Sequence, residues 1–162
     1  MTGKSAVGID FGTVRIGVAA SDPLGILASP VETIDAAGTA RTGGTDPLAR
    51  IAAIVAARHA GTVVVGLPLR MDGTEGTAAA KVRAFTDQLQ AALPAGVRIV
   101  LIDERLTTQE AHRLLDQASS RRRRNPRATK GVIDQASAVL ILQDYLDNAC
   151  SAPESPADDE PQ

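Results

Sequence analysis

The chain has 162 residues, of which 44% are hydrophobic and 22% charged, and its formal net charge is −2. This composition predicts a single globular domain of ordinary size. No apolar run approaches the ~20 residues of a membrane-spanning helix, and residues 1–5 lack the apolar core of a signal peptide. A single cysteine, Cys150, excludes an internal disulfide and a zinc site built from several cysteines. We therefore expect a cytoplasmic protein with no membrane partner.

Charge is distributed unevenly along the chain. The segment 147–162 holds five acidic residues and no Lys or Arg, which leaves 14 acidic and 17 basic side chains in residues 1–146. A segment rich in Ser, Ala, Pro and acids buries little apolar surface. We therefore predict one folded domain over residues 1–148 and a disordered acidic tail over 149–162.

The mildly basic body is compatible with a polyanionic partner. The chain has only three aromatic residues (Phe11, Phe85 and Tyr145), which are too few to recognise a single strand by base stacking. A nucleic acid would therefore be bound through its phosphates and a few polar groups.

The first predicted element is a β-hairpin over residues 6–21. Two runs rich in β-branched residues flank a turn that contains Gly12, and Asp10 stands at the tip of the first strand. A buried strand has no structural use for a charge, so this acid needs a partner or a function. A turn-forming Asp in an Asp-x-Gly sequence explains it equally well.

Strands and helices alternate after a third short strand at 31–34. Asp46 and Pro47 are typical of a helix start, and Gly61 of its end. The β-branched runs 62–66 and 97–102 predict strands buried on both faces. Further helices are predicted at 74–93, from about Thr107, and at 132–148, with a basic loop at 119–131. The order predicts an α/β fold with a mixed five-stranded sheet, three antiparallel strands plus two parallel, and helices on both faces.

Acidic residues stand where several of these elements meet loops. Asp10 ends the first strand, Asp103 and Glu104 end the last one, and Asp134 begins the final helix. Sites in open α/β sheets form outside the carboxyl ends of the strands. Converging carboxylates repel one another unless a cation holds them, and Mg²⁺ prefers such oxygen ligands. One or two such ions can support phosphodiester hydrolysis.

Each acid also has a purely structural interpretation. Asp134 could favour the dipole of its helix, and Asp103 could cap the turn before Thr107. Glu104 could pair with Arg105 on the surface. Because side chains alternate along a strand, Asp103 and Glu104 cannot both face Asp10 if the strand runs on regularly.

Four segments resemble the bacterial YqgF family, also called RuvX. They are Gly8–Thr13 with Arg15–Ala19, Val65–Pro68 with Met71–Thr74, Asp103–Thr108, and Lys130–Asp134 with Ala136–Ala138. The resemblance covers almost everything from Val7 to Tyr145. It implies a ribonuclease-H-like fold and a metal-dependent nuclease that uses Mg²⁺ or Mn²⁺, with Asp10, Glu104 and Asp134 as the acids. It also implies a role in maturation of the 5′ end of pre-16S ribosomal RNA and a kinship with Holliday-junction resolvases.

The expected partner is a structured RNA or a branched DNA, and the chain is expected to be a monomer or a weak homodimer. Gly66 would let the backbone approach a phosphate, although a tight turn also explains it. The run Arg121–Arg124 is either a phosphate clamp or a solvated loop. The predicted nucleic-acid-binding residues are Thr13, Arg15, Gly66, Arg105, Arg121, Arg122, Arg123, Arg124 and Lys130.

Two other classes of function compete with the nuclease. The segment Asp10–Thr13 also resembles the phosphate-binding strand of the actin, Hsp70 and sugar-kinase superfamily, whose members use two such domains around a nucleotide. The other alternative is a nucleic-acid-binding module that keeps the fold without cleaving. Three intact acids argue against that module.

Overall fold

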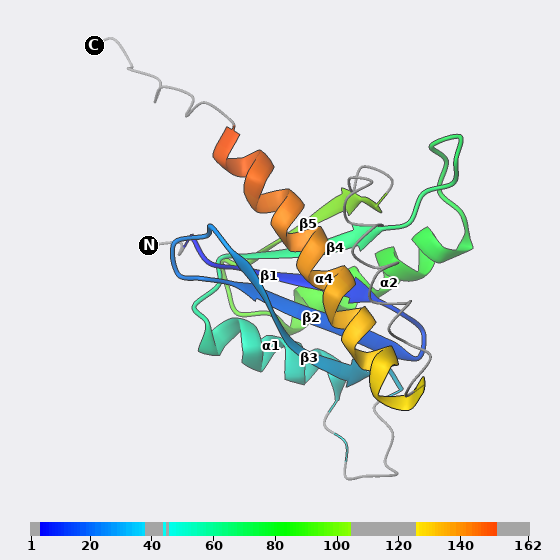
Figure 1. Ribbon diagram of the computed structural model, residues 1–162, viewed down its shortest axis with the longest axis horizontal. Coiled ribbons are helices and arrows are strands. Elements are labelled where there is room, and N and C mark those ends of the chain that lie inside the picture. The colour runs from blue at the N-terminus through cyan, green and yellow to red at the C-terminus, as the bar shows by residue number, and fades with distance from the viewer. Residues whose placement is uncertain (1–3, 38–43, 45, 105–125, 152–162) are drawn as a thin grey trace.

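A mixed five-stranded sheet forms the centre of the protein (Figure 1). The structure, a computed structural model, describes residues 4–37, 44, 46–104 and 126–151, and only the backbone of 126–133, 150 and 151. The strand order is β3-β2-β1-β4-β5. The strands are β1 (Ala6–Phe11), β2 (Arg15–Ser21), β3 (Ala28–Asp35), β4 (Thr62–Leu67) and β5 (Arg98–Asp103).

Strand directions agree with the predicted mixture. β1 pairs antiparallel with β2, and β2 pairs antiparallel with β3, with a register shift at Val18/Ala19. β4 lies parallel to β1, and β5 lies parallel to β4. The carboxyl ends of β1, β4 and β5 therefore meet at one edge of the sheet, as the sequence predicts.

Helices cover both faces. α1 (Pro47–Ala57) and α2 (Thr77–Ala92) lie on one face, and α4 (Pro126–Ser151) crosses the other (Figure 1). Asp46 caps α1 as predicted, because its carboxylate accepts a hydrogen bond from the Leu48 amide at 3.3 Å. Within the described residues, no helix is both long and apolar enough to cross a membrane.

The last helix differs from the prediction at both ends. It begins at Pro126 rather than near residue 132, because proline is well suited to the first turn of a helix. The prediction of a basic loop over 119–131 is therefore wrong for residues 126–131, which are helical. Lys130 lies in this first part of α4. Asp134 likewise does not lie in the first turn. The helix also continues to Ser151, past the domain boundary predicted at 148.

Some predicted features lie outside the described residues. They are the helix from about Thr107, the residues Arg105 and Arg121–Arg124, and positions 152–162 of the predicted tail.

Strand alternation divides the core into two layers. Side chains such as Val7, Ile9 and Val65 pack toward α1 and α2. The layer under α4 has smaller strand residues, including Ala6 and Ala19, which meet Ala138 and Leu142 of the helix. The small side chains allow α4 to lie close to the sheet.

Candidate active site

Two glycines set the position of α4 on the sheet. A Cβ atom on Gly8 would lie 2.6 Å from the Leu142 Cβ, and a Cβ atom on Gly17 would overlap the Asp134 carbonyl oxygen. Only glycine leaves room for such a close approach of helix and strand. The glycines of β1 and β2 therefore bring this stretch of α4 onto the carboxyl end of β1.

Glutamines fix α4 against β3 and the turn before it. The Gln135 amide donates to the Thr33 hydroxyl at 3.2 Å. Further along the helix, Gln143 accepts from the Ala28 amide at 2.9 Å and donates to the Ile26 carbonyl at 3.0 Å. These hydrogen bonds hold the helix that carries Asp134.

Asp10 faces α4 from the strand below. It pairs with Gly17 in the register of β1 and β2, and directly opposite residues point to the same face of a sheet. The Ser137 hydroxyl donates a hydrogen bond to the Asp10 carboxylate, which lowers the pKa of Asp10. Burial and the nearby Asp134 charge act more strongly in the opposite direction. Together they raise the pKa of Asp10 from 3.8 to about 6.

Glu104 reaches the same face from the end of β5. A Cβ atom on Gly66 would lie 2.5 Å from the Glu104 Oε1 atom, so the glutamate side chain lies over this glycine. Burial, followed by the charges of Asp10 and Asp103, raises the pKa of Glu104 from 4.5 to about 7. Asp103 pairs with Leu67, which packs in the layer toward α1 and α2, so strand alternation places Asp103 on the face away from α4.

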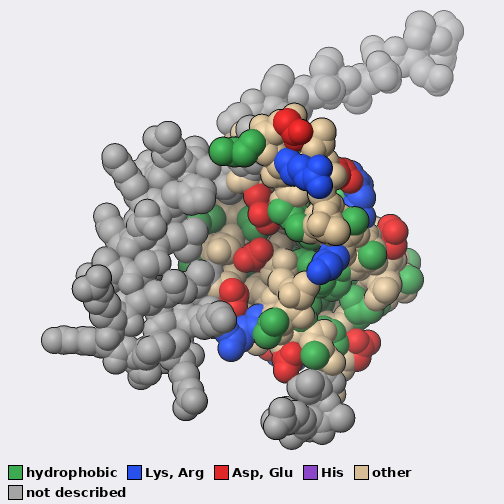
Figure 2. All heavy atoms as spheres, turned by 90° about the vertical axis from the view of Figure 1, so that its right-hand side faces the viewer, with side chains coloured by type: hydrophobic (Ala, Val, Ile, Leu, Met, Phe, Trp, Pro, Cys, Tyr) green, Lys and Arg blue, Asp and Glu red, His purple; other side chains and the backbone are tan. Residues whose placement is uncertain are grey.

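Asp10 thus interacts with both other acids, Glu104 and Asp134. Figure 2 looks onto this end of the molecule and shows acidic side chains gathered near its middle. Among the residues that the structure describes, no three His, Cys, Asp or Glu side chains are close enough together to hold a metal ion. The three acids are therefore linked by two electrostatic interactions that share Asp10, and they do not form a closed three-ligand cage.

The donor chemistry suits a hard divalent cation. Carboxylate oxygens are the ligands that Mg²⁺ and Mn²⁺ prefer, and Mg²⁺ binds to one or two carboxylates and completes its octahedron with water. A cation near Asp10 would also offset the repulsion that raises the pKa values of Asp10 and Glu104. The residues present therefore fit such an ion.

The predicted nucleic-acid-binding residues have different surroundings. Thr13 is exposed in the β1–β2 turn. Arg15 begins β2 on the face of Gly17, and its Nη1 atom is buried without a hydrogen-bond partner among the described residues. The space over Gly66 is occupied by Glu104 and Ile141, so this glycine makes room for a site acid, a use that differs from the predicted phosphate contact.

Two residues of the site were not identified from the sequence. Ser137 lies one turn after Asp134, and residues three apart lie on the same side of a helix. That spacing could have indicated a second polar group beside Asp10. Gly17 carries no comparable signal, because its role depends on how α4 crosses the sheet.

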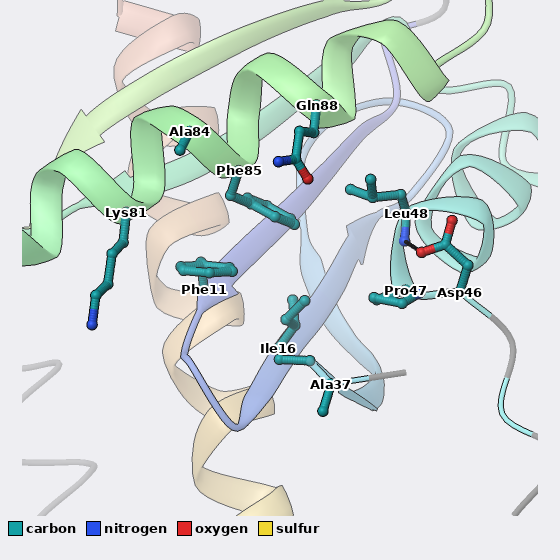
Figure 3. A pocket seen from close by; sticks show the side chains of 11 residues that line it. Phe11, Ile16, Ala37, Asp46, Pro47, Leu48, Lys81, Ala84, Phe85 and Gln88 are labelled. Carbon is teal, nitrogen blue, oxygen red and sulfur yellow. Dashed lines mark hydrogen bonds between the residues drawn. The ribbon is translucent and has the colours of Figure 1, made fainter. Parts of the chain in front are cut away.

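A separate cavity of about 450 Å³ lies on the opposite face of the sheet (Figure 3). Phe11 and Phe85 stack at its side with ring centroids 4.4 Å apart. Gln88, Leu48 and Ile16 also line it, and none of the site acids does. Phe11 follows Asp10 on β1, and the two side chains point to opposite faces. The acidic edge, where charged groups converge, is therefore the candidate active site.

Comparison with solved structures identifies the class of fold. The chain aligns with Thermus thermophilus RuvC in complex with a Holliday junction substrate, with a TM-score of 0.56 at 18% identity. The alignment covers 90% of this chain and 95% of RuvC. The mixed sheet with helices on both faces is thus a ribonuclease-H-like fold, as predicted.

Sequence comparison identifies the family to which the chain belongs. Residues 4–148 match the model of the RuvX family, which is described as Holliday junction resolvase, and the chain belongs to this family. A relative from Nocardia farcinica is 49% identical over 142 residues, which cover 87% of this chain and 76% of the relative. A relative from a Nocardioides species is 50% identical over 147 residues, which cover 87% and 86%. Both relatives are named as candidate pre-16S rRNA nucleases.

Proposed function

We propose that the chain is a nuclease that hydrolyses phosphodiester bonds with one or two Mg²⁺ or Mn²⁺ ions, each held by Asp10 together with Glu104 or Asp134. The position of Asp10 carries this proposal, because its carboxylate interacts with one acid from the end of β5 and another from α4. Partly buried like charges cost free energy, and a fold retains them where they have a function. Membership of the RuvX family supports the same activity.

The residues of the site would each have a distinct task. Asp10 interacts with both other acids and would be the shared ligand, while Ser137 fixes the direction of its carboxylate. Without a cation, Asp10 and Glu104 retain protons at higher pH than ordinary carboxyls do, and they would release them when the ion binds. A bound divalent ion polarises a phosphoryl oxygen and activates water for attack on phosphorus.

The proposed substrate is pre-16S ribosomal RNA, processed near its 5′ end in the cytoplasm. The names of the Nocardia and Nocardioides relatives support this choice. The description of the RuvX family favours branched DNA as a second candidate. Both substrates present closely spaced phosphates to one protein surface.

Arg15 is the described residue best suited to bind a substrate phosphate. A buried guanidinium N–H without a partner costs free energy, and a phosphate oxygen is a strong acceptor for it. Because Arg15 lies on the face that carries Asp10, it would offset the repulsion between the acids and the substrate. We include Thr13, Arg105, Arg121–Arg124 and Lys130 in the proposed contact surface on the basis of their sequence positions.

The activity can be tested with purified protein and three substrates. They are a pre-16S RNA fragment that spans the mature 5′ end, a four-way DNA junction and a linear DNA duplex. Each is incubated with Mg²⁺, Mn²⁺ or EDTA. Asp10→Asn, Glu104→Gln and Asp134→Asn are compared with the wild type, and Asp87→Asn, which changes an exposed acid of α2, is the matched control.

We expect cleavage that requires the divalent ion, survives in Asp87→Asn and is lost in the three site variants. Cleavage of the RNA alone would identify the first substrate, and cleavage of the junction alone would identify the second. Equal cleavage by folded wild type and folded Asp10→Asn would contradict the proposed site.

A further inference from the structure

The chain between β4 and α2 forms a projecting finger, residues 68–76, at the same edge as the site acids (Figure 1). The finger starts two residues after Gly66, the glycine that lies under Glu104. It contains the Met71–Thr74 segment, for which the proposed active site gives no role.

Hydrogen bonds hold the finger in one shape. Leu69 and Glu75 form an antiparallel bridge, and the Arg70 amide donates to the Thr74 carbonyl at 2.9 Å. Asp72 accepts hydrogen bonds from the Thr74 amide at 2.9 Å and the Thr74 hydroxyl at 2.6 Å. Gly73 takes a positive φ of 85°, which glycine adopts without strain. The tip of the finger is therefore a turn whose conformation is fixed by these hydrogen bonds.

The base of the finger is tied to α2. Glu75 accepts hydrogen bonds from the Arg83 Nε atom at 2.7 and 2.9 Å. The Arg70 side chain folds back over Gly76, where a Cβ atom would lie 3.0 Å from its Nε atom. The finger is thus fixed at its base as well as at its turn.

This rigid turn presents an apolar side chain to solvent. Met71 is 98% exposed, more than any other large hydrophobic residue that the structure describes. Val14, which is 67% exposed, occupies the β1–β2 turn at the same edge, whereas Leu24, Ile26 and Leu27 lie in the β2–β3 turn at the other end. The sheet edge that carries the site acids therefore has two loops with an exposed apolar side chain, the β1–β2 turn and the finger. The finger is the longer of these two loops.

We infer that Met71 contacts bases of the bound nucleic acid where stacking between neighbouring bases is interrupted. Methionine is among the apolar side chains that proteins insert at base steps, and a pre-shaped turn does this at low entropic cost. Phe11 and Phe85 pack against each other on the far face, so they supply no stacking surface beside the acids. The preferred substrate then has a branch or a junction of single and double strands near the scissile phosphate.

This inference rests on the proposed nuclease function, and one binding experiment separates the two. Fluorescence anisotropy is measured in Ca²⁺ with a duplex that carries a single-stranded branch and with the same duplex without the branch. A 2-aminopurine base at the branch reports unstacking. Met71→Ser is compared with Met71→Leu, which keeps an apolar tip, and with Leu24→Ser, which removes an exposed apolar residue at the other end. Thermal melts check that all variants are folded.

We expect Met71→Ser to weaken binding of the branched duplex on the order of fivefold and to abolish the rise in 2-aminopurine fluorescence. Met71→Leu and Leu24→Ser should behave like the wild type, and binding of the unbranched duplex should not change. Wild-type binding and fluorescence in Met71→Ser would overturn the inference and leave the nuclease proposal intact. Failure of the wild type to bind any of these nucleic acids would overturn both.

Discussion

The carbonyl oxygen of Asp134 lies directly over Gly17, on the strand position opposite Asp10. A helix backbone and a strand backbone touch here with no side chain between them. The contact brings an acid of α4 beside an acid of β1, and it requires glycine in β2.

Gly17→Ala should displace α4 and separate Asp134 from Asp10. The added Cβ would overlap the α4 backbone at Asp134, and no change of side-chain rotamer can relieve this overlap. We therefore expect the free energy of unfolding to fall by about 1–3 kcal/mol and cleavage to be largely lost. Urea unfolding and a nuclease assay measure the two effects. Gly44→Ala, the same change at an exposed position, is the control. Full activity in Gly17→Ala would contradict this role.

Asp10→Asn should stabilise the metal-free protein at neutral pH. The pKa of Asp10 is raised to about 6, so between about pH 4 and pH 6 the folded chain binds more protons than the unfolded chain. The free energy of unfolding of the wild type therefore falls as pH rises through this window. The Asp10→Asn variant has no carboxyl at this position, so its free energy of unfolding does not fall in this way. We expect it to be more stable than the wild type by roughly 1–2 kcal/mol at pH 7 in EDTA. Urea unfolding at pH 4 and pH 7 provides the test, and an equal difference at both pH values would contradict it.

Glu104→Gln and Asp103→Asn should have different effects, because the two side chains lie on opposite faces of the sheet. Glu104 lies over Gly66 on the face of Asp10, so Glu104→Gln should greatly weaken Mn²⁺ binding. Because the pKa of Glu104 is raised to about 7, Glu104→Gln should also raise the melting temperature at neutral pH in EDTA, as expected for Asp10→Asn. Asp103→Asn should retain the metal and cost about 1 kcal/mol of stability if it caps the following turn. Calorimetric titration of Mn²⁺ and thermal melts measure both. Loss of the metal in Asp103→Asn alone would reverse the assignment.

Ser137→Ala should weaken metal binding by about tenfold while leaving the fold intact, because an unheld Asp10 carboxylate binds a cation less well. Ser137→Thr keeps the hydroxyl and should retain most of the affinity. Mn²⁺ titration by calorimetry supplies a measurement that does not depend on cleavage. If alanine and threonine bind the ion equally, the hydroxyl has no part in positioning Asp10.

Arg15→Gln should weaken binding of all nucleic acids to a similar extent. Loss of one phosphate contact lowers the slope of log affinity against log salt concentration by ~0.9 for duplex DNA and ~0.7 for single strands. Anisotropy titrations from low to moderate salt measure this slope, with Arg58→Gln, an exposed residue at the end of α1, as the control. An unchanged slope in Arg15→Gln would show that its guanidinium has a structural role.

Local sequence patterns are sufficient to predict most of the fold. The β-branched run at 62–66 and the Asp46-Pro47 pair depend on neighbouring residues alone, and both predicted elements are present. The meeting of Asp10 and Glu104 at one edge also follows, because the carboxyl ends of parallel strands share an edge. The predicted start of α4 near residue 132 is wrong, because α4 begins at Pro126. An arginine-rich segment is typical of a solvated loop, and this pattern outweighs the single proline that can begin a helix.

The rest of the site depends on contacts between distant segments. The sequence of β2 does not show whether Gly17 is needed for a turn, a bulge or a close helix crossing. The role of Gly17 depends on its contact with α4, which lies more than a hundred residues further along the chain. The same holds for Gly66, whose missing side chain leaves room for Glu104. Burial of Asp10 likewise comes from α4, so its raised pKa could not be predicted from the residues around it.

The acids are separated widely along the chain, and this separation imposes an order on synthesis. Asp10 leaves the ribosome with the first strand, whereas Asp134 belongs to a helix that is made after all five strands. A nascent chain therefore carries the sheet before it carries a complete set of acids. If ribosomal RNA is the substrate, as proposed, a half-made copy cannot cut the ribosome that is producing it.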